Sequence, residues 1–293
     1  TGQYNTGVGA LALDANTTAD NNTAVGFGSL GANTTGASNV AVGTYALDAN
    51  TTAANNTAVG YNALTTSTAT GGTAVGYGAL AANVSKNYET AVGYLALTTA
   101  TTGYYNVAVG KSALAATSSG ARNTAVGYDA LEANTTGSYN TAVGNFALTL
   151  NTTTTNNTAI GYNSLAANVA SNNTAVGQGA LAGNTTGATN VAVGQGALDA
   201  NTTADNNVAV GANAMTASTT GAGNTAVGKG SLEANTTAAN NTAVGFLALL
   251  ANTTGTERTA VGADSSYGGD TESDNTVSVG YRSMYMDDAT TAD

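Results

Sequence analysis

Few residues of this chain could carry out chemistry, and most of those are acidic. The 293-residue sequence contains no histidine and no cysteine, so the commonest general base and the thiolate nucleophile are both absent. Acidic residues recur five positions after a periodic glycine, as at Asp14, Asp48 and Glu132, but never in adjacent repeats. Because paired catalytic carboxylates and calcium ligands must lie close together, this spacing predicts neither. We therefore expect no enzymatic activity, no metal site and no cofactor.

The charge and hydropathy of the chain limit its partners. There are 17 acidic residues against 6 basic ones, which gives a formal net charge of −11. A nucleic-acid-binding protein would carry a basic stripe instead. No apolar run is long enough to cross a membrane as a helix. We expect neither nucleic-acid binding nor membrane insertion.

Two groups of residues could contact or carry sugars. Tyr61, Tyr77 and Tyr94 directly follow the periodic glycine in three consecutive repeats and predict a stacked aromatic ladder. Such a ladder could bind glycan rings, or it could shield a corner or pack against a neighbouring chain. A column of ten Asn-x-Ser/Thr sequons could be N-glycosylated where exposed, or its asparagines could simply form tight corners. These asparagines are Asn16, Asn33, Asn50, Asn83, Asn134, Asn151, Asn184, Asn201, Asn235 and Asn252.

All of these residues belong to one tandem repeat that fills the chain. Its anchor is the glycine that ends the phrase Asn-Thr-Ala-Val-Gly, and the step between anchors is 17 residues, apart from two steps of 16 and a last step of 18. Repeats of this length are typical of solenoids. The seventeen anchors are Gly9, Gly26, Gly43, Gly60, Gly76, Gly93, Gly110, Gly127, Gly144, Gly161, Gly177, Gly194, Gly211, Gly228, Gly245, Gly262 and Gly280.

The columns of the repeat predict an all-β fold, a parallel β-solenoid or β-roll of about seventeen 17-residue coils. The residue before the anchor is Val in sixteen copies, and the residue four after it is Leu in fourteen. β-Branched residues next to the glycine favour a strand, and we expect a second short strand to start at the Ala-Leu pair. Val would then stack on Val and Leu on Leu from coil to coil. The expected core ladder includes Val25, Val42, Val59, Val75, Leu30, Leu47, Leu64 and Leu80.

A column of small residues carries an expectation about assembly. The position two before the anchor is Ala in fifteen copies, so something must pack closely on this face. It could be the opposite side of the same coil, or partner chains around an axis. The thin core of a 17-residue coil favours partner chains and therefore a homotrimer. The expected assembly face includes Ala24, Ala41, Ala58 and Ala74.

The array divides into a regular part and an irregular end. Residues 1–262 keep the register, whereas residues 263–293 form an acidic terminal segment. In that segment Ser266 replaces the usual Leu, and residues 267–274 interrupt the coil. We expect a regular solenoid followed by one irregular coil.

The run Asn-Thr-Ala-Val-Gly-Tyr-Asn-Ala-Leu at residues 56–64 resembles known repeats. It is similar to the head repeats of trimeric autotransporter adhesins and, more closely, to repeat arrays of phage and bacterial tail-fibre proteins. This resemblance covers nearly the whole chain, although the coil is longer than in the adhesin heads. It implies a left-handed parallel β-roll, three chains side by side, and a place on the surface of a cell or virion.

The function expected from these patterns is that of a structural, non-enzymatic subunit of an extracellular fibre or filament. Self-association could be lateral, as a homotrimer, or end to end, because unpaired strand edges favour stacking. One alternative is a glycan-binding adhesin or receptor-binding module of a tail fibre. Another is an ice-binding solenoid, which needs outward Thr on alternate positions of a flat face. It ranks last, because the paired Thr17 and Thr18 are adjacent at a corner.

Overall fold

The computed structural model describes residues 2–82, 88–268 and 274–285. Within this part of the chain every coil contributes one three-residue strand, the rest of the coil is turns and bends, and there is no helix. The strands are β1 (Thr6–Val8), β2 (Thr23–Val25), β3 (Val40–Val42), β4 (Thr57–Val59), β5 (Thr73–Val75), β6 (Thr90–Val92), β7 (Val107–Val109), β8 (Thr124–Val126), β9 (Thr141–Val143), β10 (Thr158–Ile160), β11 (Thr174–Val176), β12 (Val191–Val193), β13 (Val208–Val210), β14 (Thr225–Val227), β15 (Thr242–Val244), β16 (Thr259–Val261) and β17 (Val277–Val279).

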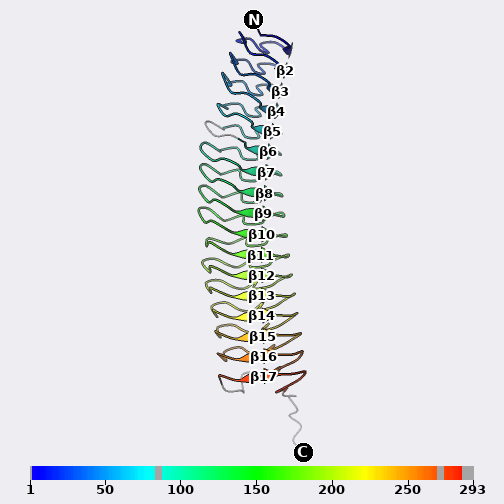
Figure 1. Cartoon of the computed structure of the whole chain (residues 1–293), viewed down its shortest axis with the longest axis vertical. Helices are drawn as coiled ribbons and strands as arrows, with labels where there is room; N and C mark the ends of the chain where they lie inside the picture. The colour runs from blue at the N-terminus through cyan, green and yellow to red at the C-terminus, as the bar shows by residue number, and fades with distance from the viewer. Residues whose placement is uncertain (1, 83–87, 269–273, 286–293) are drawn as a thin grey trace, which may run out of the picture. The chain divides into compact units, whose positions relative to one another are not determined.

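The chain divides into two compact units, residues 1–155 and residues 156–293. In each unit, consecutive strands pair in parallel and stack one above another in chain order (Figure 1). The register follows the repeat, so that Ala24 lies opposite Ala41 in the first unit and Ala192 opposite Ala209 in the second. The predicted all-β parallel β-solenoid is confirmed.

Left-handed backbone turns replace the second strand that we expected. In the coil of Gly60 the φ angle is 137° at the glycine, 54° at Asn62 and 53° at Leu64. Alternate residues with positive φ cannot form extended backbone, so the Ala-Leu segment winds instead of pairing as a strand. The expectation of a strand at this pair is therefore wrong. Similar angles recur from coil to coil, including φ of 49° at Leu30 and 53° at Leu198.

The anchor glycines allow the coils to stack closely. Gly194 has a φ of +139°, and a Cβ added there would lie 2.3 Å from the carbonyl oxygen of Gly211 in the next coil. An L-residue would combine a strained backbone with a steric clash. The glycine column is thus required by both conformation and space.

The valines of the strands point outward, which contradicts their expected place in the core. In β2 the middle residue Ala24 is fully buried, whereas Thr23 and Val25 on either side are only half-buried. Neighbouring side chains of a strand point to opposite faces, so an inward Ala forces its neighbours outward. A thin coil has room inside for alanine at this position and not for valine. The valines wrongly assigned to the core ladder are Val25, Val42 and Val59, which are half-buried, and Val75, which is 37% exposed.

The alanines and leucines fill the apolar side of the interior together. Gly7 occupies the Ala position of its coil, and a Cβ added there would lie 3.6 Å from Cδ1 of Leu13 and 4.0 Å from Cβ of Ala12. The Ala face therefore packs against the opposite side of the same coil. The expectation that partner chains pack on this face is wrong, because one chain already closes it. Fully buried members are Leu30, Leu47, Leu64, Leu80, Ala24, Ala41, Ala58 and Ala74.

Candidate functional site

The polar side of the interior consists of two asparagine ladders. The first ladder lies four residues before each anchor glycine. Within it, the backbone N–H of Asn39 donates to Oδ1 of Asn22 in the preceding coil at 2.9 Å. The second ladder lies seven residues after the glycine, where Nδ2 of Asn50 donates to Oδ1 of Asn33 at 2.9 Å. The ladders therefore connect successive coils through side chains as well as through the backbone.

Where a described coil carries both asparagines, the two ladders meet on one backbone carbonyl group. Nδ2 of Asn22 and Nδ2 of Asn33 both donate to the backbone oxygen of Gly36, each at 2.9 Å. In the second unit, Asn190 and Asn201 donate to the oxygen of Ala204 at 2.8 and 3.2 Å. These bonds span the interior and satisfy a carbonyl that would otherwise be buried without a partner. The asparagines thus hold the coil closed.

This arrangement overturns N-glycosylation as an interpretation of the sequon column. A glycan needs an exposed amide nitrogen, but these nitrogens donate hydrogen bonds inside the coil. Asn16 is half-buried and bonds to Ala19, and Asn83 lies outside the described residues. The fully buried members, exposed by at most 1%, are Asn33, Asn50, Asn134, Asn151, Asn184, Asn201, Asn235 and Asn252.

Four coils carry another residue in the first ladder, namely Gly72, Glu89, Arg258 and Thr276. The carboxyl group of Glu89 is fully buried and accepts two hydrogen bonds from Asn106, from its backbone N–H at 3.0 Å and from Nδ2 at 3.2 Å. Burial raises the pKa of Glu89 to about 7, against the opposing effect of these bonds. Ala100 replaces the asparagine of the second ladder in the same coil, and so leaves room for the longer side chain.

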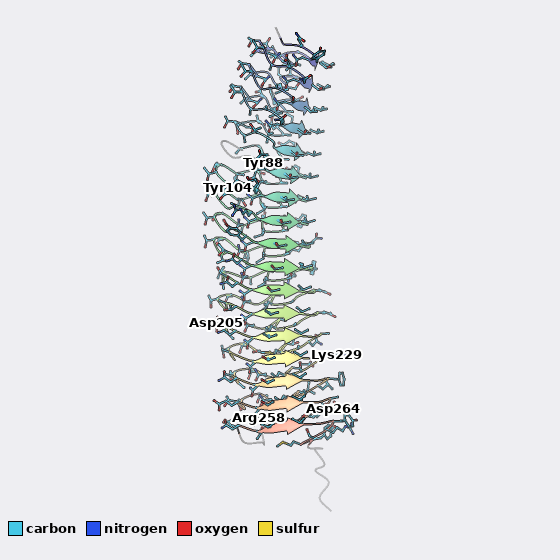
Figure 2. All side chains as sticks on the ribbon, in the orientation of Figure 1. Tyr88, Tyr104, Asp205, Lys229, Arg258 and Asp264 are labelled. Carbon is cyan, nitrogen blue, oxygen red and sulfur yellow. The ribbon has the colours of Figure 1, made fainter. Side chains whose placement is uncertain are left out.

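Arg258 links the two ladders near the end of the regular array. Its backbone N–H donates to Oδ1 of Asn241 at 2.9 Å, and its Nη1 donates to Oδ1 of Asn252 at 2.9 Å. The guanidinium lies over Gly255, where a Cβ would meet Cζ at 2.2 Å. Arginine is a poor core residue unless it is hydrogen-bonded. Here the hydrogen bonds to Asn241 and Asn252 give Arg258 a structural role. Figure 2 shows it beside the last strands of the second unit.

An exposed aromatic column follows the strands of the first unit. The rings of Tyr61 and Tyr77 are stacked with centroids 5.4 Å apart, and those of Tyr77 and Tyr94 are 5.2 Å apart. The predicted ladder of these three tyrosines is present. The column, which lies one or two residues after the anchor glycines, consists of Phe27, Tyr45, Tyr61, Tyr77, Tyr94, Lys111, Tyr128 and Phe146.

The geometry of this column does not favour the sugar-binding interpretation. Sugars stack on the face of an aromatic ring, but both faces of Tyr77 are covered by its neighbours at interplanar angles of 11° and 14°. Tyr94 is followed in the column by Lys111, whose Nζ lies 4.7 Å from the centroid of the Tyr128 ring. The column therefore presents ring edges and hydroxyl groups to solvent.

Sequence reasoning missed a second aromatic column, which precedes the strands. Tyr88 and Tyr105 are stacked at 5.7 Å, and the guanidinium of Arg122 lies 5.3 Å from the centroid of the Tyr139 ring. Figure 2 shows Tyr88 and Tyr104 on the same side of the strands of the first unit. The spacing of 17 residues from Tyr88 through Tyr105 and Arg122 to Tyr139 was the available signal.

The outward residues of the strands form what we call the Thr/Val face, whose valines sequence reasoning placed in the core. It consists of the first and last residue of each strand from β1 to β17, and none of these residues is charged. Several of its side chains are well exposed, including Ile160 at 40% and Val261 at 39%. The signal was the exchange of Thr for Val at Val40 and Val107, because an outward column tolerates both.

The corner threonines are occupied by bonds between coils. Oγ1 of Thr34 donates to the carbonyl oxygen of Thr51 at 2.9 Å, and Oγ1 of Thr185 donates to that of Thr202 at 2.8 Å. These hydroxyl groups thus extend the ladder of the backbone at the corner. They do not form a free hydroxyl array.

No group of acidic, histidine or cysteine side chains that could hold a metal ion occurs within the described ranges. Nor does that part of the chain contain any helix of the length and apolarity that crossing a membrane requires. No protein-family model matches the sequence, and no curated protein is significantly similar to it.

Proposed function

We propose that the chain is a structural, non-enzymatic subunit of a fibre on the surface of a cell or virion, and that its copies associate laterally through the Thr/Val face. The observation that carries this proposal is that every strand presents two outward uncharged side chains. Repeated, partly exposed methyl groups along the strands of each unit provide apolar surface, and large apolar patches on a protein surface mark interaction sites.

The chemistry of the Thr/Val face suits a second copy of the same chain. Its two columns repeat at each coil, so parallel chains in register can pack methyl groups against methyl groups along a whole unit. Burying such groups contributes roughly 25 cal/mol per Å² of apolar surface. The proposal keeps the homotrimer implied by the resemblance to adhesin heads and tail fibres, with left-handed coils. It moves the interface from the Ala face to the Thr/Val face.

The mass of the native particle tests this assembly. We expect three times the 28.3 kDa of the single chain. Replacing Val193 and Val210 with lysine adds charge to the face in two adjacent coils and should release single chains. The matched control places lysines at the exposed corner residues Gln178 and Gln195, and should keep the native mass.

Two outcomes would contradict lateral association. One is a native chain that stays at the mass of a single copy at every concentration. The other is an unchanged particle mass in the Val193→Lys, Val210→Lys variant. Circular dichroism of each variant establishes that the coils are still folded, so that a change of mass reports assembly.

Ice binding is a second candidate. The corner threonines spoke against it in the sequence, but the strands also carry outward threonines. In β2 and β4, Thr23 and Thr57 lie outward beside inward alanines, so the face presents a column of hydroxyl and methyl groups, interrupted by valines such as Val40 in β3. Neighbouring coils are roughly 4.7–4.9 Å apart in such a sheet. Ice binding requires this face to be free, whereas lateral association covers it. Thermal hysteresis of a single-chain particle would favour ice binding, and its absence would exclude it.

A further inference from the structure

We propose that Tyr61, Tyr77 and Tyr94 form a site of oxidative tyrosine coupling, at which a peroxidase-type oxidant joins the rings of consecutive coils as dityrosine. This modification would tie neighbouring coils together covalently. It concerns residues that lie outside the strands, and it does not depend on the proposed function.

The geometry brings the phenol groups of consecutive coils together. The Tyr61 and Tyr77 rings are nearly parallel at 11° with centroids 5.4 Å apart, and Tyr77 and Tyr94 are at 14° and 5.2 Å. All three side chains are accessible, with exposed fractions of 45%, 49% and 50%. An oxidant can therefore reach each ring, and the resulting radical already has a phenol beside it. Holding reactants in this way converts an encounter between molecules into a reaction within one.

The chemistry balances with hydrogen peroxide as the terminal oxidant. A haem peroxidase removes one electron and one proton from each of two phenols, and hydrogen peroxide is reduced to two molecules of water. The two phenoxyl radicals combine through a new bond between ring carbons ortho to the hydroxyl groups, that is, between one Cε atom of each ring. The hydrogens on these carbons then move to the oxygens, which restores both aromatic rings. The product is lighter than the two tyrosines by two hydrogen atoms.

The same column contains natural comparison positions. Tyr45 meets Tyr61 edge-on, at 77° and 6.4 Å, which is a poorer arrangement for coupling. Tyr128 is exposed, but its column neighbours are Lys111 and Phe146, which cannot form dityrosine. If stacking determines the reaction, Tyr77 and Tyr94 should couple readily and Tyr128 should not. Exposure alone would make all of them react.

The test is to treat the full chain, in dilute solution, with hydrogen peroxide and a haem peroxidase, and to map the coupled peptides by mass spectrometry. We expect products that join Tyr77 to Tyr61 or to Tyr94. The same treatment in concentrated urea should lose this selectivity. In the Tyr77→Phe variant, which keeps the ring but removes the phenol, Tyr94 should be recovered uncoupled. The control Tyr128→Phe should leave the yield of the Tyr77 products unchanged.

Three results would overturn the proposal. Tyr94 that still couples in the Tyr77→Phe variant would show that stacking with Tyr77 is not the cause. Products at Tyr128 in proportion to its exposure would show that accessibility alone decides. Products that form only between chains would show that the stack is unreactive within one molecule.

Discussion

Replacing Asn190 with alanine tests whether the Asn ladders hold the coils together. Asn190 is fully buried in β12's coil, and its Nδ2 donates to the oxygen of Ala204 at 2.8 Å. Its Oδ1 accepts from the backbone N–H of Asn207 in the next coil at 2.9 Å. Alanine removes both bonds. The oxygen of Ala204 keeps a second donor in Asn201 at 3.2 Å, whereas the N–H of Asn207 is left buried without its acceptor.

The magnitude follows from these two losses. The bond to Ala204 contributes about 0.5–1.5 kcal/mol, and the unsatisfied N–H of Asn207 costs about 1–3 kcal/mol. We therefore expect Asn190→Ala to lower the local free energy of opening by about 1.5–4.5 kcal/mol. Hydrogen exchange of amides in residues 186–210 measures this directly, because solenoid coils can open locally. The control is Gln195→Ala, which truncates an exposed side chain of the same coil and should change little.

The Asn190→Asp variant distinguishes the two roles of this side chain, because it keeps the acceptor oxygen and removes the donor nitrogen. The carboxylate can still accept from Asn207, but it faces the carbonyl oxygen of Ala204, so burial and repulsion should raise its pKa in the folded chain. Because the folded pKa is raised, the Asn190→Asp variant should lose stability at neutral pH, where the buried carboxyl is charged. This loss should disappear below the unfolded pKa of about 3.9, where the neutral carboxyl can donate again.

The result for Asn190→Ala can refute the reasoning. A change in stability of less than about 0.5 kcal/mol, within the range of ordinary surface substitutions, would do so.

Three further predictions concern other columns. Because burial raises the pKa of Glu89 from 4.5 to about 7, folding should favour its protonated form. Stability should then fall by about 3 kcal/mol as pH rises from below 4.5 through 7, and urea unfolding at pH 5 and 8 should show no such loss for Glu89→Gln. Gly194→Ala should cost at least about 3 kcal/mol in the same assay, and a tolerated alanine would contradict the clash across coils. Leu198→Ala should lower the stability of single chains by about 2–5 kcal/mol, and Val193→Ala should lower it clearly less. The reverse order would mean that valine belongs to the core after all.

The sequence was sufficient to predict the fold because every repeat has the same pattern of residues and therefore forms the same coil. The regular return of Gly, Val and Leu predicts a parallel solenoid, since only stacked coils place the same residue at the same point each time. Leu30 and Leu47 lie inside as expected. The three stacked tyrosines followed from the same logic, because consecutive coils place residues in columns.

The sides of the strand could not be assigned from the pattern alone. Alternation predicts that Ala24 and Val25 face opposite ways, but not which of them faces inward. The larger side chain of valine made it the expected core residue. The narrow interior of the coil, which is wound by residues with positive φ such as Leu30, accommodates alanine instead. Leucine rarely adopts a positive φ on its own, so the surrounding coil must impose that angle. Propensity alone gives no sign of it.

The role of the sequon asparagines was equally hidden. Asn33 followed by two threonines reads both as a glycosylation signal and as a corner residue. Only the closure of the coil decides between them, because it brings Asn22, fourteen positions before Gly36, onto the same carbonyl group as Asn33. A bond between residues so far apart in sequence has no local signature.

The hydrogen bonds between coils run along the direction in which the coils stack, and this gives each unit a distinct response to tension. A pull on the ends of a unit loads the terminal coil first, because each coil bonds only to its neighbours. Its bonds break together, and the next coil then carries the force. Each released coil of 17 residues adds about 56–61 Å of extended chain. A stretched unit should therefore lengthen in equal steps, absorbing work one coil at a time while the remaining coils keep their structure.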